Sequence, residues 1–186
     1  MADPRGLVIA APSSGAGKTL VTLGLLRALA RAGTSVASAK AGPDYIDPRF
    51  HEAASGCACF NLDDWAMRED LIVSLAGQCA GTSELMLIEG VMGLFDGAAG
   101  GGGSTADLAA TLGLPVVLVV DAKSQGQSAA AIVKGFAEFR DDCRIAGVIF
   151  NRVASASHAA RLPVAVAPLG SAAPRRWPTS VAHAWA

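Results

Sequence analysis

Short apolar runs alternate along the chain with longer stretches whose apolar residues recur every three or four positions. The short runs predict buried strands at residues 6–11, 34–40, 84–90, 114–122 and 143–151. The longer stretches predict helices at residues 18–31, 69–79, 104–112 and 124–139. Apolar strands separated by helices are typical of a parallel sheet with helices on both faces. We therefore predict an α/β fold whose ligands bind at the carboxyl ends of the strands.

Two segments depart from this alternation. Residues 93–109 contain a run of glycines and join a strand end to a helix start, which favours an active-site loop over a plain linker. From about Leu162 onward the regular alternation stops, and residues 169–186 have no apolar period. We expect one domain at residues 1–168, followed by an irregular tail at residues 169–186.

Composition narrows the possible functions mainly by exclusion. The chain has 186 residues, of which 52% are hydrophobic and 17% are charged, and these values suit one compact domain. A net charge of -1 gives no reason to expect a nucleic acid or a membrane surface as partner. The N-terminal residues lack the pattern of a signal peptide, and no apolar run approaches the roughly 18 residues of a membrane span. We expect a cytoplasmic protein.

The cysteines and histidines do not suggest a metal or redox centre. The cysteines lie at positions 57, 59, 79 and 143, a spacing that matches no zinc or redox motif. In a cytosolic chain we expect them to be reduced and mostly buried. The histidines, at positions 51, 158 and 183, are scattered along the sequence. We predict no cluster of soft metal ligands.

A glycine-rich stretch, "APSSGAGKT" at residues 11–19, lies between the first predicted strand and the first predicted helix. Its glycines allow backbone N–H groups to surround a phosphate, and the helix N-terminus adds partial positive charge. We predict that Lys18 reaches the β- and γ-phosphates and that the Thr19 hydroxyl binds Mg²⁺. Pro12 replaces the first glycine of the usual motif. The predicted nucleotide-binding residues of this P-loop are Ser14, Gly15, Ala16, Gly17, Lys18, Thr19 and Leu20.

Charged residues follow two further predicted strands at their carboxyl ends. Lys40, Asp44 and Asp47 come after the second strand, and Glu89 and Asp96 come after the third. Mg²⁺ at a triphosphate prefers one or two carboxylates together with water. One ordinary metal-binding carboxylate of a P-loop protein would explain one of these acids, but not a lysine together with two aspartates. The alternative explanation for the two aspartates is a surface loop held by salt bridges. The pattern indicates a metal-bound nucleotide at this edge of the sheet.

Five stretches together resemble a known enzyme family. In chain order they are "APSSGAGKT", "KAGPDYIDP", "IEGVMGLFDG", "GGSTADLA" and "VIFNRV". In order and spacing they are similar to the N-terminal synthetase half of cobyrinic or hydrogenobyrinic acid a,c-diamide synthase, a P-loop protein related to dethiobiotin synthetase. The resemblance covers roughly residues 5–160, and "GPDYIDP" is its most specific part.

This resemblance implies an ATP-dependent amidation in cobalamin biosynthesis. A carboxylate of the corrin macrocycle would attack the γ-phosphate of ATP to give an acyl phosphate, and ammonia would then displace phosphate. The reaction would repeat at the second acetate group. The implied ligands are ATP, Mg²⁺ and a corrinoid, and the transfer depends mainly on positioning and on neutralising charge.

The resemblance also assigns roles in phosphoryl transfer to individual residues. Thr19, Asp47 and Glu89 are the implied Mg²⁺ ligands. Lys40 is implied to give electrostatic help to the anionic acyl phosphate, beside Lys18 at the γ-phosphate.

Further residues are implied on the substrate side of the site. Asp44, Tyr45 and Asp96 match positions that line the corrinoid and ammonia side, where either aspartate could hold ammonium and accept its proton. Asn151 resembles an asparagine that contacts the adenine edge. Independently, the pattern from Ser104 and Thr105 to Asp107 predicts a helix N-cap with exposed N–H groups, which could receive a substrate carboxylate.

The chain departs from this family in one respect. The family enzyme continues into a glutaminase domain with a nucleophilic cysteine and a histidine partner, and no cysteine here has that context. We expect the synthetase part only, with ammonia coming from a glutaminase domain that this chain lacks. We expect ATP binding with weak or absent turnover, and a homodimer is a further expectation.

Three other functions stay open at this point. A partitioning or cell-division switch ATPase would carry an extra lysine at the position of Ser13, which is not lysine. Dethiobiotin synthetase or cobyric acid synthase would be another carboxylate-activating enzyme, but "GPDYIDP" and the glycine-rich loop at 97–103 disfavour both. A nucleotide-binding scaffold without turnover is the third.

Overall fold

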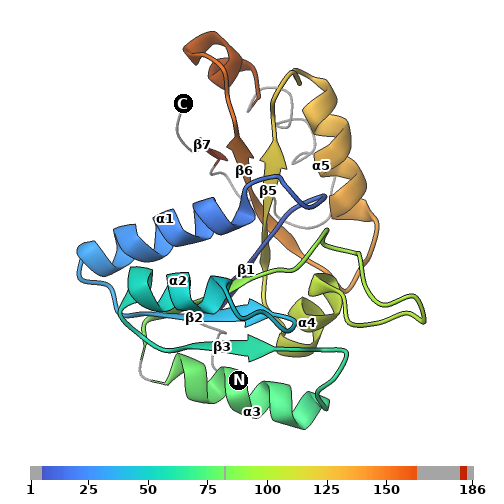
Figure 1. The fold of residues 1–186 in the computed structure, drawn as a ribbon. Helices are drawn as coiled ribbons and strands as arrows, with labels where there is room; N and C mark the ends of the chain where they lie inside the picture. The colour runs from blue at the N-terminus through green and yellow to red at the C-terminus, as the bar shows by residue number, and fades with distance from the viewer. Residues whose placement is uncertain (1–5, 82, 163–180, 184–186) are drawn as a thin grey trace.

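A computed structural model describes residues 6–81, 83–162 and 181–183. Its strands are β1 (Gly6–Ala10), β2 (Val36–Ala41), β3 (Cys59–Leu62), β4 (Leu85–Glu89), β5 (Val116–Asp121), β6 (Ile145–Asn151) and β7 (Val181–His183). They form one sheet in the order β3-β2-β4-β1-β5-β6-β7, in which every neighbouring pair is parallel (Figure 1). The predicted α/β fold with a parallel sheet is confirmed.

The helices connect these strands. They are α1 (Lys18–Arg31), α2 (Asp47–Ser55), α3 (Glu69–Ala80), α4 (Thr105–Leu112) and α5 (Ser128–Glu138), and residues 156–162 are also helical. The predicted bounds of α1 agree with the structure, whereas α5 begins later than residue 124. Ser124 has a φ of 59°, so the chain turns there before the helix begins. No helix in the described part of the chain is long and apolar enough to cross a membrane.

Two elements between β2 and α3 were not predicted. In helix α2 only Pro48 and His51 are buried, so the helix shows no apolar stripe in its sequence. Its start does carry a signal, because proline is favoured in the first turn of a helix. Strand β3 is four residues long and lies at the edge of the sheet, which is too short for a clear pattern.

The predicted tail at 169–186 lies outside the described residues, except for 181–183. Those three residues form β7 and pair with β6, where irregular chain was expected. A three-residue strand is too short to produce a recognisable apolar period.

The helices lie in two layers, one on each face of the sheet. Helices α1 and α2 lie on one face, and α3, α4 and α5 lie on the other (Figure 1). Strand β1 shows how one strand serves both layers: Val8 and Ala10 belong to the core on the α4 side, whereas Ile9 packs on the α1 side. Because both faces are buried, the strand is apolar throughout.

Neighbouring strands β1 and β4 connect in opposite directions across the sheet. Strand β1 leads through α1 to β2, and β4 leads through α4 to β5. Since crossovers between parallel strands are right-handed, α1 and α4 lie on opposite faces. The carboxyl ends of β1 and β4 therefore border a crevice, which is where ligands bind in sheets of this kind.

Candidate functional site

The loop between β1 and α1 has the geometry of a phosphate-binding loop. Gly15 and Gly17 have φ values of 81° and 95°, in the left-handed region that glycine adopts readily. Gly17 is the N-cap of α1, so the helix N-terminus points into the loop. A pocket of about 280 Å³ opens there, lined by Ser14, Gly15, Gly17, Lys18, Thr19, Lys40, Glu89, Gly90 and Met92.

Two of the predicted nucleotide-binding residues do not line this pocket. Ala16 is buried against β1 and β5 in the core on the α1 side. Leu20 points away from the core with 73% of its side chain exposed. Any contact of these two residues with nucleotide therefore stays a prediction.

Asn151, at the end of β6, holds the loop from the other side. Its amide Nδ2 donates to the carbonyl oxygen of Ala16 at 2.8 Å, and its Oδ1 accepts from the backbone N–H of Arg152. A Cβ at Gly17 would collide with this amide group, so position 17 requires glycine for space as well as for φ. The predicted contact of Asn151 with the adenine edge stays a prediction, and the observed contact adds a role in fixing the P-loop.

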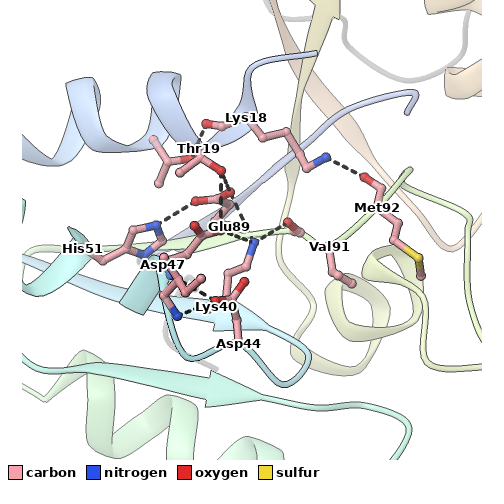
Figure 2. A network of polar contacts seen from close by, with 12 residues as sticks. Lys18, Thr19, Lys40, Asp44, Asp47, His51, Glu89, Val91 and Met92 are labelled. Atoms are coloured by element: carbon pink, nitrogen blue, oxygen red, sulfur yellow. Dashed lines mark hydrogen bonds and ion pairs between the residues drawn. The ribbon is translucent and has the colours of Figure 1, made fainter. Parts of the chain in front are cut away.

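Charged groups from β2, α2 and β4 meet beside Thr19. Lys40 Nζ lies 3.1 Å from Asp47 Oδ2 and 3.2 Å from Glu89 Oε1. The Thr19 hydroxyl lies 2.5 Å from the same Glu89 oxygen and 3.5 Å from the same Asp47 oxygen. Figure 2 shows these side chains pointing toward one another from separate elements. The structure thus brings together the three residues that were predicted to bind Mg²⁺.

The Glu89 carboxyl group is fully buried, yet it is ionised. Burial alone would raise the pKa of this carboxyl, but the hydrogen bond from His51 and the charge of Lys40 outweigh burial and lower it below its ordinary value. Lys40 is held in turn by the carbonyl oxygen of Gly90 at 3.1 Å. Each buried charge in the cluster therefore lies beside a charge of opposite sign, which offsets the cost of burying it.

Lys18 reaches across the pocket to the chain after β4. Its Nζ donates to the carbonyl oxygen of Met92 at 2.6 Å (Figure 2). Burial and then the nearby charge of Lys40 lower the pKa of the Lys18 amino group, against the opposing effect of Glu89 and Asp96. Both lysines therefore converge on one pocket with the acidic groups.

His51 is a site residue that the sequence analysis missed. It is fully buried in α2, and its Nε2 lies 2.7 Å from Glu89 Oε2. The signal available in the sequence was its position four residues after Asp47, which places both on the same face of a helix. Because helix α2 was not predicted, this spacing could not be interpreted as one face of a helix.

Asp44 and Asp96 shape the chain beside the pocket. Asp44 Oδ1 accepts the backbone N–H groups of Ile46 and Asp47, which positions the start of α2. Burial would raise the pKa of Asp44, but these two hydrogen bonds lower it. Asp96 Oδ2 accepts the N–H of Gly93 at 3.0 Å, in the turn after β4. Their predicted roles toward ammonium and corrinoid stay predictions.

Tyr45 lies next to Asp44 and does not pack in the core. Its side chain is 90% exposed. Trp65, Phe50 and Met92 are also exposed, by 71%, 55% and 44% respectively. These large apolar side chains follow the carboxyl ends of β2, β3 and β4 or lie in α2. Of these four residues, Met92 lines the phosphate pocket.

Ser104 is the N-cap of α4, as predicted. Its Oγ accepts from the backbone N–H of Asp107, and the Asp107 carboxylate accepts from the Ser104 N–H in return. However, the predicted free N–H groups are not observed for Ala106 and Asp107, because Ala106 N–H donates to Leu94. The Thr105 hydroxyl is buried and bonds to the backbone of Val91. These contacts do not favour the substrate-carboxylate role, which stays a prediction for Ser104 and Thr105.

The residues beside Thr19 fit a Mg²⁺–nucleotide site. Among the described residues there is no group of three or more His, Cys, Asp or Glu side chains that could hold a metal alone. Mg²⁺ would not require one, because it usually binds one or two carboxylates and completes its shell with water and phosphate oxygens. A hydroxyl and two carboxylate oxygens that meet at the mouth of a phosphate loop match that preference.

Comparison with protein families decides the class of this site. Residues 7–174 match the model of the CobQ/CobB/MinD/ParA nucleotide binding domain. The chain belongs to this family. As a CobQ/CobB/MinD/ParA domain it binds nucleotide, in agreement with the observed P-loop.

Several relatives of this nucleotide-binding domain are hydrogenobyrinate a,c-diamide synthases. Over 89% of the chain, identity is 59% to the enzyme of Brucella anthropi and 60% to that of Brucella ovis. Identity is 54% over 93% of the chain for the enzyme of Rhodobacter capsulatus. The predicted resemblance is confirmed. The chain spans 38% of the length of the two Brucella relatives and 41% of the third.

Solved structures extend the likeness of fold beyond these relatives. Chloroplast FtsY from Physcomitrella patens superimposes with a TM-score of 0.66 at 17% identity, covering 97% of this chain and 59% of that one. The hydrogenase maturation factor HypB from Archaeoglobus fulgidus gives 0.60 at 16% identity, covering 97% and 81%. At these identities the comparison concerns the fold alone.

Proposed function

We propose that this chain is the synthetase part of an enzyme that amidates the a and c acetate carboxylates of a corrinoid, with ATP as the activating substrate. The observation that carries the proposal is the meeting of Lys40, Asp47 and Glu89 around Thr19 at the mouth of the P-loop pocket. A switch ATPase needs one acidic residue near its metal ion. A lysine between two carboxylates suits a reaction in which several anionic groups, here the phosphates and a substrate carboxylate, come together. The names of the relatives support the corrinoid as substrate.

In this proposal Mg²⁺ would be held by Thr19, Asp47 and Glu89. When bound, the ion neutralises charge on the β- and γ-phosphates and keeps them in line. The fit is supported by the three side-chain oxygens, which face one another beside the P-loop. Both carboxylate oxygens also contact Lys40 Nζ, so Mg²⁺ would share them with this lysine or replace it.

Lys18 and Lys40 would each neutralise negative charge at a different place in the site. Lys18 belongs to the P-loop and would hold the transferred phosphoryl group, leaving the carbonyl oxygen of Met92 that it contacts in the structure. Lys40 would stabilise the acyl phosphate that forms when the substrate carboxylate attacks the γ-phosphate, with ADP as the leaving group. Its low exposure supports this role, since a charge acts more strongly where water is excluded.

The corrinoid would lie over the exposed apolar side chains beside the pocket. Tyr45, Phe50, Trp65 and Met92 offer surface for a large ring, while its acetate group points toward Lys40. Asp44 and Asp96 would hold ammonium at this edge and accept its proton as the amine attacks the acyl phosphate. Ammonia would come from a glutaminase that is not among these residues.

The cysteines support an external source of ammonia. Burial raises the pKa of Cys59 to about 12 and that of Cys143 to about 11, so both are thiols at neutral pH and poor nucleophiles. Burial also raises the pKa of Cys79, and Cys57 is exposed on the loop after α2.

The Asp47→Asn variant tests this function. We expect at least about a hundredfold loss of Mg²⁺-dependent phosphate release in the presence of hydrogenobyrinic acid and ammonium, because the amide neither neutralises charge nor binds Mg²⁺ well. The circular dichroism spectrum should be unchanged, because the Asp47 side chain is partly exposed.

The matched control is Asp70→Asn, which removes a carboxylate that is exposed on α3, forms an ion pair with Arg68 and accepts the backbone N–H of Leu71. It should release phosphate at the parent rate. Full turnover in Asp47→Asn would contradict the assigned metal site. Nucleotide-dependent dimerisation with no effect of corrinoid on phosphate release would instead favour a switch ATPase.

A further inference from the structure

Two buried polar groups lie behind the nucleotide pocket and are not explained by it. His51 is fully buried and Cys59 is 9% exposed, and neither lines the pocket. His51 comes from α2, and Cys59 is the first residue of β3. Polar side chains at such depth are usually there because another group needs them.

These groups form a chain of contacts that ends on Glu89. Cys59 Sγ lies 3.4 Å from His51 Nδ1, and His51 Nε2 lies 2.7 Å from Glu89 Oε2. The other oxygen, Oε1, contacts Thr19 and Lys40. In the sheet β2 separates β3 from β4 (Figure 1). The His51 imidazole contacts Cys59 on β3 and Glu89 on β4, so it spans the strand between them.

The chemistry of the three groups fixes the direction of these hydrogen bonds. An ionised carboxylate can only accept, so Nε2 of His51 carries the hydrogen and donates to Glu89. In the tautomer that carries its hydrogen on Nε2, Nδ1 has a free lone pair and can accept a hydrogen bond. Burial raises the pKa of Cys59 to about 12, so its thiol keeps a proton and can donate to Nδ1.

We propose that His51 is a positioning residue for the metal site: it holds Oε2 of Glu89 so that Oε1 faces Thr19, and Cys59 holds the His51 ring in the donating tautomer. This inference rests on the proposed function, in which Glu89 binds Mg²⁺. A carboxylate with one oxygen fixed loses rotational freedom before the metal arrives. In metal sites, loss of such a supporting hydrogen bond typically weakens metal binding about 10–100-fold.

A merely structural role for His51 makes a different prediction. If the imidazole only fills the core, its loss lowers the stability of the whole chain, but ATP binding in the presence and absence of Mg²⁺ changes equally. If it positions Glu89, the loss falls selectively on the contribution of Mg²⁺. The two roles are therefore separable by one pair of binding measurements.

The experiment compares His51→Leu, His51→Gln and His51→Asn in the full chain. Isothermal titration measures the Kd of ATP with EDTA, and a Mg²⁺ titration at saturating ATP gives the concentration for half-maximal effect. The glutamine amide reaches about as far as Nε2, whereas the asparagine amide reaches about as far as Nδ1 and cannot reach Glu89. All three variants remove the imidazole, but only glutamine restores a donor to the carboxylate.

For His51→Leu and His51→Asn we expect a 10–100-fold higher Mg²⁺ requirement with an unchanged Kd for ATP in EDTA. His51→Gln should stay within about threefold of the parent. If the leucine variant fails to fold, the glutamine and asparagine variants, both polar amides, decide the question.

Two results would overturn different parts of this account. An equal Mg²⁺ requirement in the parent, asparagine and leucine variants contradicts the positioning role but leaves the proposed function standing. A parent chain whose nucleotide binding does not respond to Mg²⁺ contradicts the metal assignment of Glu89 itself.

Discussion

At the scale of single residues, Lys40 and Glu89 are both almost completely buried, with 4% and 0% exposed. Each charge alone would be expensive to bury, and their pairing with each other and with Asp47 offsets that cost. Their presence at this depth therefore indicates a need for charge at this place rather than a gain in stability. The same residues meet at the metal and phosphate side of the pocket.

The reactivity of the cysteines gives a prediction at this scale. With an alkylating reagent at pH 8, Cys57 should react first, because it is exposed, while Cys59, Cys79 and Cys143 should react only as the chain opens. Burial raises the pKa of all three slow thiols and so removes their reactive thiolate form.

Mass spectrometry of the intact protein checks this expectation. A single adduct should form early in buffer and four adducts in urea, which matches the four cysteines of the chain. The variant Cys57→Ser should lack the early adduct. Early labelling of Cys59 would show that the packing between α2 and β3 is open.

At the scale of elements, α4 depends on its first turn. Ser104→Ala should lower the free energy of unfolding by about 1 kcal/mol, because the N–H of Asp107 loses its cap and the Asp107 carboxylate loses the hydrogen bond from the Ser104 hydroxyl. Urea unfolding followed by circular dichroism measures the change.

Ser74→Ala in α3 is the matched control for this substitution. The Ser74 hydroxyl accepts an exposed hydrogen bond from Gln78, so its replacement should change the free energy of unfolding by no more than about 0.5 kcal/mol. Equal effects of the two substitutions would mean that the capping box does not stabilise the folded chain.

How far the elements could be predicted from the sequence depended on how each one buries its side chains. Strands β1 and β5 are apolar on both faces, so a simple run of residues identifies them. Helix α2 buries Pro48 and His51 and exposes Phe50. It carries the polar side chain of His51 to the site. An apolar period cannot reveal such a helix.

The site was predictable to the extent that it follows strand ends. Thr19, Asp47 and Glu89 could be expected to meet because carboxyl ends of parallel strands share one edge. His51 was missed because helix α2, which places it on the same face as Asp47, was not predicted, and its contact with Glu89 depends on the fold. The contact of Asn151 with the P-loop is unpredictable for the same reason.

At the scale of the whole molecule, the hydrophobic core includes the helical residues 156–162 that follow β6. Leu162 is fully buried and packs in the same cluster as Ile72, Leu118 and Phe150. Residues 156–162 therefore extend the core on the α5 side of the sheet.

Leu162→Ala should accordingly lower the free energy of unfolding by about 2–5 kcal/mol, the usual cost of such a cavity. Thermal and urea unfolding measure this loss. Leu71→Ala on α3 is the control, since Leu71 is 41% exposed, and it should cost about 1 kcal/mol or less. A negligible loss at Leu162 would mean that the core ends before this segment.

Helices α1 and α4 leave the neighbouring strands β1 and β4 on opposite faces of the sheet. This arrangement separates two roles: the strands form the fold, and the loops at the crevice carry the chemistry. Because α1 and α4 leave on opposite faces, loops border the crevice at the ends of β1 and β4, and these loops could change in length or sequence while the strands keep their places. The fold can therefore stay constant while the loops set the chemistry. Chloroplast FtsY and HypB share this fold with the chain at 16–17% identity, and a fold by itself does not determine a function.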